Sequence, residues 1–297
     1  YGRVSTGYRA GGFNRVILPG ETEPAGIDKE TLTNFELGVK GLFKEDRLKL
    51  TSAVFYQLFE DYQLQGARFK ESKYLVPGTS PVITQIFNVP DTKIWGFEVE
   101  GTYHLNDRWQ LSGYYNYLGS DVGPVSAVVY PSLTGAGDPI FEPNAEWGTY
   151  FGVSSLAESP QQQYFIMPKT HTGNTLPQQP KHKFGLVAQY SRPLGGDLGT
   201  IDLLSSYTHT GERYSSISNE DFWQIPSYAR LDLRGTWTSE NERLSATLYV
   251  QNAFDEIGVV EFNPEVRASG FPGFGVALGV LTEHRQVGLR LSWRPNI

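Results

Sequence analysis

Two glutamates, Glu98 and Glu100, stand two residues apart in a stretch of alternating apolar and polar side chains, Ile94–Leu105. A pair of carboxylates is the catalytic equipment of most glycosidases, so this pair is the first candidate for chemistry. Side chains two residues apart in an extended strand point to the same face. Charges repeated on one strand face must meet water, and a hydrated lumen therefore explains the pair better than a glycosidase site.

Other catalytic patterns do not appear in the chain. The five histidines (His104, His171, His182, His209 and His284) form no i, i+4 pair. There is no GxSxG or Walker motif, and the glycines of 270–279 do not have dinucleotide-binding spacing. The absence of cysteine excludes thiolate metal sites and disulfides. We therefore expect no catalytic residue, no metal, no cofactor and no enzyme activity, and the net charge of −7 disfavours a nucleic-acid partner.

Aromatic side chains are frequent in the long segments between the alternating stretches. Aromatic rings stack on ring-containing ligands, and arginine pairs with anions, which makes these segments candidates for ligand binding. An equally open alternative is that the rings pack loop against loop or lie at a membrane interface. The candidate ligand-binding residues are Tyr130, Phe141, Trp147, Tyr150, Tyr164, Arg213, Tyr214, Trp223, Phe262 and Arg267.

Ten stretches of the chain alternate with period two and predict the strands of an all-β protein. In the last, Val287, Leu289, Leu291 and Trp293 share one face, and the polar residues between them share the other. A strand with one apolar and one polar face suits a wall between lipid and water. The ten stretches are Tyr1–Tyr8, Leu32–Phe43, Leu48–Gln63, Ile94–Leu105, Trp109–Leu118, Lys181–Ser191, Thr200–His209, Tyr228–Trp237, Leu244–Gln251 and Arg285–Trp293.

The connections between these strands alternate in length. Short polar turns lie at 44–47, 106–108, 192–197 and 239–242, and long segments at 10–30, 66–91, 119–180, 211–226 and 252–284. No run of about 18 apolar residues predicts a transmembrane helix. The alternation predicts an antiparallel up-and-down β-barrel with short periplasmic turns and long extracellular loops, whose final strand ends on the side of the turns.

Five motifs in order resemble the TonB-dependent outer-membrane receptors. Tyr1–Asn14, YGRVSTGYRAGGFN, resembles the family's strand ending in GGFN, and Glu30–Phe43, ETLTNFELGVKGLF, resembles its next strand. Asn88–Gly101 resembles its strand with the pattern G-x-E-x-E. Pro177–Lys183, PQQPKHK, and Leu248–Asp255, LYVQNAFD, resemble two further family patterns. Each motif alone is weak evidence for the family, but the order of all five along the whole chain is specific to it.

The resemblance implies a barrel of 22 strands filled by an N-terminal plug. Residues 1–297 would form one domain, about ten C-terminal strands of that barrel, and would lack the plug, the TonB box and the early strands. We therefore expect a fragment of a longer protein. The last residue, Ile297, stands where the family usually has Phe, and Trp293 would then serve as the terminal aromatic.

The resemblance also implies a function in the outer membrane of a Gram-negative bacterium. The whole protein would bind and import a scarce, bulky solute, with a ferric siderophore as the first expectation. Energy would come from the TonB complex, acting through the missing plug. The barrel would contact lipid and would supply the wall and part of the ligand surface.

Two alternatives remain open at this stage. One is a passive outer-membrane pore or adhesin, in which the ten strands close on themselves and the first pairs with the last. The other is a soluble all-β carbohydrate-binding domain, which would bury Trp95, Phe97, Leu111, Leu248 and Leu289 in a core.

Overall fold

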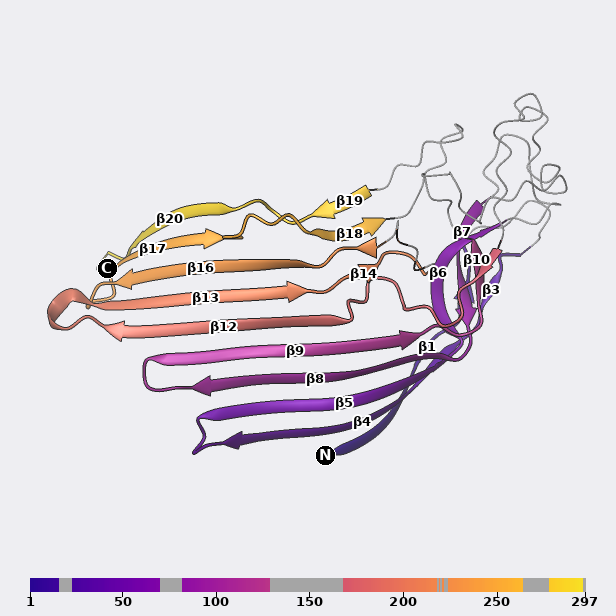
Figure 1. The fold of residues 1–297 in the computed structure, drawn as a ribbon, viewed down its shortest axis with the longest axis horizontal. Coiled ribbons are helices and arrows are strands. Elements are labelled where there is room, and N and C mark those ends of the chain that lie inside the picture. Colours follow the sequence, from indigo (N-terminus) through magenta and orange to yellow (C-terminus); the bar gives the residue numbers. More distant parts are fainter. Residues whose placement is uncertain are drawn as a thin grey trace, which may run out of the picture.

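Ten antiparallel strands form one sheet in sequence order, each connected to its neighbour (Figure 1). The computed structural model describes residues 1–15, 23–69, 82–128, 168–217, 219, 221, 224–263 and 278–295. The strands are β1 (Gly2–Arg9), β4 (Glu30–Phe43), β5 (Leu48–Glu60), β8 (Thr92–His104), β9 (Trp109–Asp121), β12 (His182–Pro193), β13 (Thr200–Thr210), β16 (Tyr228–Thr238), β17 (Leu244–Gln251) and β20 (Gln286–Trp293). The predicted number and order of strands are thus confirmed.

The two ends of the sheet differ. The short connections β4–β5, β8–β9, β12–β13 and β16–β17 lie together at one end, on the left in Figure 1, with the C-terminus beside them. Small two-stranded hairpins lie at the other end. They are β2 (Gly12–Phe13) with β3 (Gly26–Ile27), β6 (Tyr62–Phe69) with β7 (Val82–Val89), β10 (Ser126–Val128) with β11 (Pro168–Thr170), β14 (Arg213–Tyr214) with β15 (Gln224–Ile225), and β18 (Val259–Asn263) with β19 (Leu278–Leu281). The predicted separation of short turns and long loops is confirmed.

The registers of the ten strands gather apolar side chains on one face, which we call the apolar face. Leu37, Val54 and Phe97 lie directly opposite one another on β4, β5 and β8. Leu248 and Leu289 pair in the same way on β17 and β20. Directly paired residues of antiparallel strands point to the same side, so these rows are continuous across the sheet. Charged residues on this face lie only at strand ends, at Glu60, Lys93, Asp121 and Arg192, within the ten described strands.

The opposite face, the polar face, carries the charged side chains of the strand interiors. Glu98 pairs with Asn116, and Asn116 in turn with Lys183. Lys40, Glu100, Arg230, Asp232, Arg234 and Arg290 belong to the same face. The two glutamates of the strand Thr92–His104 therefore share a face, as their spacing predicts.

Aromatic rings border the apolar face at both ends. Phe43, Tyr103, Trp109, Tyr190, Trp237 and Trp293 lie near the short turns. Trp109 and Tyr190 pack with ring centroids 4.8 Å apart, and the indole of Trp237 donates a hydrogen bond of 2.7 Å to the carbonyl of Leu198. Tyr8, Tyr56, Trp95, Tyr115, Tyr117, Phe184 and Tyr207 lie toward the other end. Two aromatic borders around an apolar band are typical of strands that cross a bilayer.

Four of the five residues that a soluble domain would bury are solvent-exposed: Phe97, Leu111, Leu248 and Leu289. The fifth, Trp95, is half-buried. Strands β1 and β20 are the two edges of the sheet and do not pair with each other, so the ten strands form an open sheet and not a closed ten-stranded barrel. Within the described part of the chain, no helix is long and apolar enough to cross a membrane.

One predicted strand differs in extent. The alternation Leu48–Gln63 was expected to form a single strand, but β5 ends at Glu60 and β6 begins at Tyr62. Asp61 between them has a φ of 56°, in the left-handed region, which breaks the extended conformation. The chain therefore changes direction there and enters a hairpin that the sequence pattern assigned to a loop.

Candidate functional site

The buried apolar residues of the described chain gather at the hairpin end and not between the strands of the large sheet. Leu64 and Phe87 come from the β6–β7 hairpin, Val122 and Leu176 from the two ends of the connection between β9 and β12, and Ile217 from the connection after β13. Val89 and Val122 are fully buried. This cluster packs the bases of three long connections together, so they form one structural unit rather than independent loops.

Side-chain amides attach the first long connection to the β6–β7 hairpin. Asn14 accepts a hydrogen bond from the amide of Ile86 (2.8 Å) and donates one to its carbonyl (2.9 Å). Asn88 donates to the carbonyl of Asp28 (3.0 Å) and accepts from its amide (2.9 Å). Such paired contacts imitate a strand ladder, and they hold irregular backbone in place where no neighbouring strand is available.

Arg213 connects the last three long connections. Its Nε donates to Oε1 of Gln178 (3.4 Å), and its Nη2 donates to the carbonyls of Val259 (3.0 Å) and Val260. The residue is 7% exposed, and burial lowers the pKa of its guanidinium. Nη1 has no hydrogen-bond partner in the described part of the chain. Arg213 thus holds three loop bases together through neutral acceptors.

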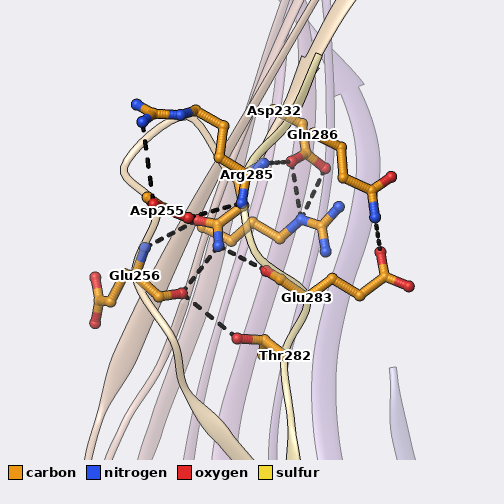
Figure 2. A network of polar contacts seen from close by, with 9 residues as sticks. Asp232, Asp255, Glu256, Thr282, Glu283, Arg285 and Gln286 are labelled. Carbon is orange, nitrogen blue, oxygen red and sulfur yellow. Dashed lines mark hydrogen bonds and ion pairs between the residues drawn. The ribbon is translucent and has the colours of Figure 1, made fainter. Parts of the chain in front are cut away.

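A polar network fixes the connection from β17 to β20 (Figure 2). Asn252 donates from its side chain to the carbonyls of Glu256 and Glu283, both at 2.9 Å, and its amide donates to the carboxylate of Asp232 (2.8 Å). The carboxylate of Asp255 accepts from the amide of Arg285 (2.8 Å). Because Asn252 and Asp255 both have positive φ values, 49° and 57°, this network stabilises a tight reversal directly after β17.

The hydrogen bond from the Arg285 amide is the main cause that lowers the pKa of the Asp255 carboxyl. His284 and Arg285 add to this effect, with side-chain nitrogens 3.4 Å and 4.0 Å from the carboxylate oxygens. Asp255 is therefore ionised at neutral pH and keeps its place as the acceptor of the network. Its position in the resembled QNAFD pattern agrees with this structural role.

The structure places two of the ten candidate ligand-binding residues in full. Arg213 and Tyr214 form β14; Arg213 is buried and Tyr214 is half-buried. The backbone of Phe262 lies in β18. The side chain of Phe262 lies outside the described residues, as do Tyr130, Phe141, Trp147, Tyr150, Tyr164, Trp223 and Arg267. The prediction that these ten residues bind a ligand stays a prediction.

Sequence reasoning missed the residues that hold the loop bases. Asn14, Gln63, Asn88 and Asn252 bond to backbone groups that are distant in sequence, and Gln178 accepts from the side chain of Arg213. All of these residues except Gln63 stand in the motifs that resemble the family, but the motifs do not indicate these contacts. Among the described residues, no three His, Asp or Glu side chains are grouped in a way that could hold a metal ion.

Comparison with known proteins agrees with this architecture. The family model described as "TonB dependent receptor-like, beta-barrel" matches residues 1–253. A probable TonB-dependent siderophore receptor, PiuA of Acinetobacter baumannii ATCC 19606, is 23% identical over 230 residues, which cover 77% of this chain and 24% of the relative.

Two solved structures share the fold over 98% of the chain. The ferric yersiniabactin uptake receptor FyuA of Yersinia pestis is 18% identical with a TM-score of 0.64, and the chain covers 34% of it. The siderophore receptor PiuA of A. baumannii is also 18% identical, with a TM-score of 0.57 and the same 34% coverage. The chain thus spans about a quarter to a third of the length of these proteins, and it belongs to the β-barrel domain family of TonB-dependent receptors.

Proposed function

We propose that residues 1–297 are the C-terminal part of an outer-membrane receptor that imports a ferric siderophore with energy supplied through TonB. The observation that carries the proposal is the division of the sheet into two faces. Charged side chains of the strand interiors are confined to the polar face, and aromatic rings border the apolar face at both ends. This division suits a wall with lipid outside and a hydrated, plug-filled lumen inside.

The arrangement of the connections supports the receptor role. The five long connections emerge at the same end, and their bases are fixed by the buried cluster, the side-chain amides and Arg213. A fixed base preorganises the described hairpins that it supports, and preorganisation favours tight binding of a scarce solute. Two of the matched proteins are named as siderophore receptors and the third as a ferric yersiniabactin uptake receptor, so a ferric siderophore is the first cargo to test.

The proposal assigns no bond-making chemistry to this chain. The family consists of transport receptors, and the side chains described here serve as wall, loop support and ligand surface. In the whole protein, the polar face would contact the plug. Coupling to TonB would reach the cargo through that plug.

Uptake in cells tests the proposal directly. A strain that expresses the full-length receptor as its only route for a radiolabelled ferric siderophore should bind the chelate and accumulate iron. Deletion of tonB should abolish accumulation while surface binding remains. Accumulation that continues without TonB would contradict active transport and would favour a passive pore. Absence of both binding and accumulation across hydroxamate, catecholate and phenolate chelates would contradict the siderophore assignment.

A further inference from the structure

A cavity of about 330 Å³ lies at the hairpin end of the sheet, between the β2–β3 hairpin, β7 and the segment that follows β9. Sites for small molecules have volumes of about 300–1,000 Å³, so the cavity is large enough for part of a cargo molecule. It is also larger than the space that one buried water needs.

The described residues that line the cavity are neutral. Asn14, Gln85 and Asn88 supply side-chain amides, while Gly26, Pro124 and Val125 supply apolar surface and backbone. No lining side chain from the described segments carries a charge. A charged ligand group would lose its hydration here without gaining a counter-charge, whereas an uncharged polar group could exchange water for amide hydrogen bonds.

Three of the four buried or half-buried amides in this region already use their donor groups. Asn14 donates to Ile86 and Asn88 donates to Asp28 and Asp61, the last at 2.8 Å. Gln63 donates to the carbonyls of Ala10 (2.9 Å) and Asp28 (3.0 Å). These side chains are thus occupied in holding the first long connection.

Gln85 is different. It lines the cavity and is only 8% exposed, yet its Nε2 has no hydrogen-bond partner among the described residues. A buried amide donor without a partner costs free energy, and proteins retain such groups where a water, ion or ligand completes them. We therefore expect the Nε2 group of Gln85 to donate to an acceptor oxygen from outside the described chain.

We propose that this cavity, which we call the Gln85 pocket, binds an uncharged, oxygen-rich part of the cargo, and that the covered side-chain amide of Gln85 turns into the cavity so that Nε2 donates to a carbonyl or hydroxyl oxygen. This inference rests on the proposed function and deepens it. It predicts that the receptor selects a neutral chelate with amide or hydroxamate oxygens over a chelate whose surface is anionic.

A first experiment determines the structure of the full-length receptor without cargo. The inference requires that the Gln85 pocket is open to solvent and that no protein atom accepts a hydrogen bond from Gln85 Nε2. A protein atom of the plug or of another strand bonded to Nε2 would overturn the inference, since the donor would then be completed by the receptor itself.

A second experiment measures binding of ferrichrome, a neutral ferric hydroxamate, and of ferric enterobactin, an anionic ferric catecholate, to the purified full-length receptor. Wild-type receptor should bind ferrichrome more tightly. Gln85→Glu replaces the donor by an acceptor and should weaken ferrichrome binding about tenfold or more. Gln65→Glu is the matched control, because Gln65 is exposed on the neighbouring strand and does not line the cavity.

A second pair of variants guards against misfolding of Gln85→Glu. A Cβ added at Gly26 or at Gly12 would meet no atom within 4 Å, so both positions accept a Cβ without a clash. Gly26 lines the cavity and Gly12 does not, although both belong to the β2–β3 hairpin. Gly26→Leu should therefore weaken ferrichrome binding at least tenfold, and Gly12→Leu should leave it unchanged.

The outcomes separate this inference from the proposed function. Unchanged ferrichrome binding in both Gln85→Glu and Gly26→Leu would overturn the pocket and leave siderophore transport standing. Binding of ferric enterobactin but not ferrichrome by wild type would overturn the neutral-cargo inference alone. Binding of neither chelate would overturn the pocket together with the siderophore assignment.

Discussion

Arg213 shows how one buried side chain can organise several loops. Its guanidinium bonds to Gln178 in one connection and to Val259 and Val260 in another, while its own backbone belongs to a third. Arginine suits this position because its planar group presents donors in several fixed directions, and it remains charged even where burial lowers its pKa. A lysine would offer one ammonium group and could not reach all three acceptors.

We expect Arg213→Ala to loosen the loop bases without unfolding the sheet. Hydrogen bonds from a charged group contribute about 1.5–3 kcal/mol each, and removal leaves part-buried carbonyls without this donor. Hydrogen exchange of the full-length receptor should show faster exchange around 176–180 and 258–261, with unchanged exchange in β16 and β17. Arg290→Ala is the control, because Arg290 is exposed on the polar face. Equal protection in both variants would contradict the role of Arg213.

The lowered pKa of Asp255 predicts that the stability of the connection between β17 and β20, and of no other connection, depends on pH. Its folded pKa is lowered, first by the hydrogen bond from the Arg285 amide and then by His284. A carboxyl whose pKa is lowered on folding stabilises the folded state above its unfolded pKa, about pH 4, and this contribution is lost as the pH falls through the folded pKa. The network in Figure 2 should therefore hold at neutral pH and open only below about pH 4.

Limited proteolysis of the full-length receptor with an acid-active protease tests this dependence. Cleavage between β17 and β20 should increase from pH 5 to pH 3 in the wild type. In Asp255→Asn the carboxylate is absent at every pH, so cleavage there should be high at pH 5 and change little on acidification. A wild-type profile that is flat over this range, with a stable sheet, would contradict the assignment.

At the scale of the strands, glycines and aromatic rings form repeated cross-strand pairs. Tyr114 lies opposite Gly185, Trp95 opposite Gly119, and Tyr249 opposite Gly288. In each pair, the ring occupies the space in which a side chain at the glycine would lie. The ring thereby covers backbone that glycine leaves bare, and glycine's weak preference for strands is offset by this packing.

Gly185→Ala should therefore destabilise the sheet although alanine is the better strand residue. The new Cβ would lie 2.6 Å from Cε1 of Tyr114, so the ring must leave its place, at a cost of about 1–3 kcal/mol. Urea unfolding of the full-length receptor in lipid should show this loss. Gly7→Ala, also on the polar face, has no neighbour within 4 Å and should not lower stability. A double variant with Tyr114→Ala should recover part of the loss, and equal stability of Gly185→Ala and wild type would contradict the packing argument.

The strands of the sheet could be predicted from sequence because the side chains of one face of each strand are mainly apolar over most of its length. The Val287–Trp293 alternation leaves one consistent register, since a shift by one residue would put Arg290 on the apolar face. The hairpins of the long connections could not be predicted in this way. β14 and β15 have two residues each, too few for a period, and their position depends on Gln178 and Val259, which are distant in sequence. The left-handed turn at Asp61 also leaves no mark in the hydrophobic pattern.

The candidate ligand residues show a second limit of sequence reasoning. Arginine in a long connection suggested an anion partner, but the donors of Arg213 mostly reach backbone carbonyls, and carbonyls are acceptors that no side-chain pattern reveals. Gln85, by contrast, could not be predicted from the sequence, because an isolated glutamine has no charge and belongs to no motif. Its importance comes only from burial beside a cavity, which is a property of the folded connections.

For the whole molecule, the assignment of lipid to the apolar face can be tested at two neighbouring residues. Leu248 is 57% exposed on the apolar face and pairs with Leu289, while Thr247 points to the polar face and pairs with Arg290. An arginine on the lipid-facing side of a barrel costs about 2–4 kcal/mol at the bilayer midplane, whereas an arginine facing a hydrated lumen costs little. Leu248→Arg should thus reduce the fraction of the full-length receptor that folds into lipid vesicles and the amount of heat-resistant, folded barrel in outer membranes. Thr247→Arg should reduce neither.

If the sheet were the surface of a soluble protein, Leu248→Arg would be harmless, because an exposed leucine can be replaced by a charge at little cost. Equal folding of both variants in lipid would therefore contradict the membrane orientation, and a larger loss in Thr247→Arg would reverse the two faces.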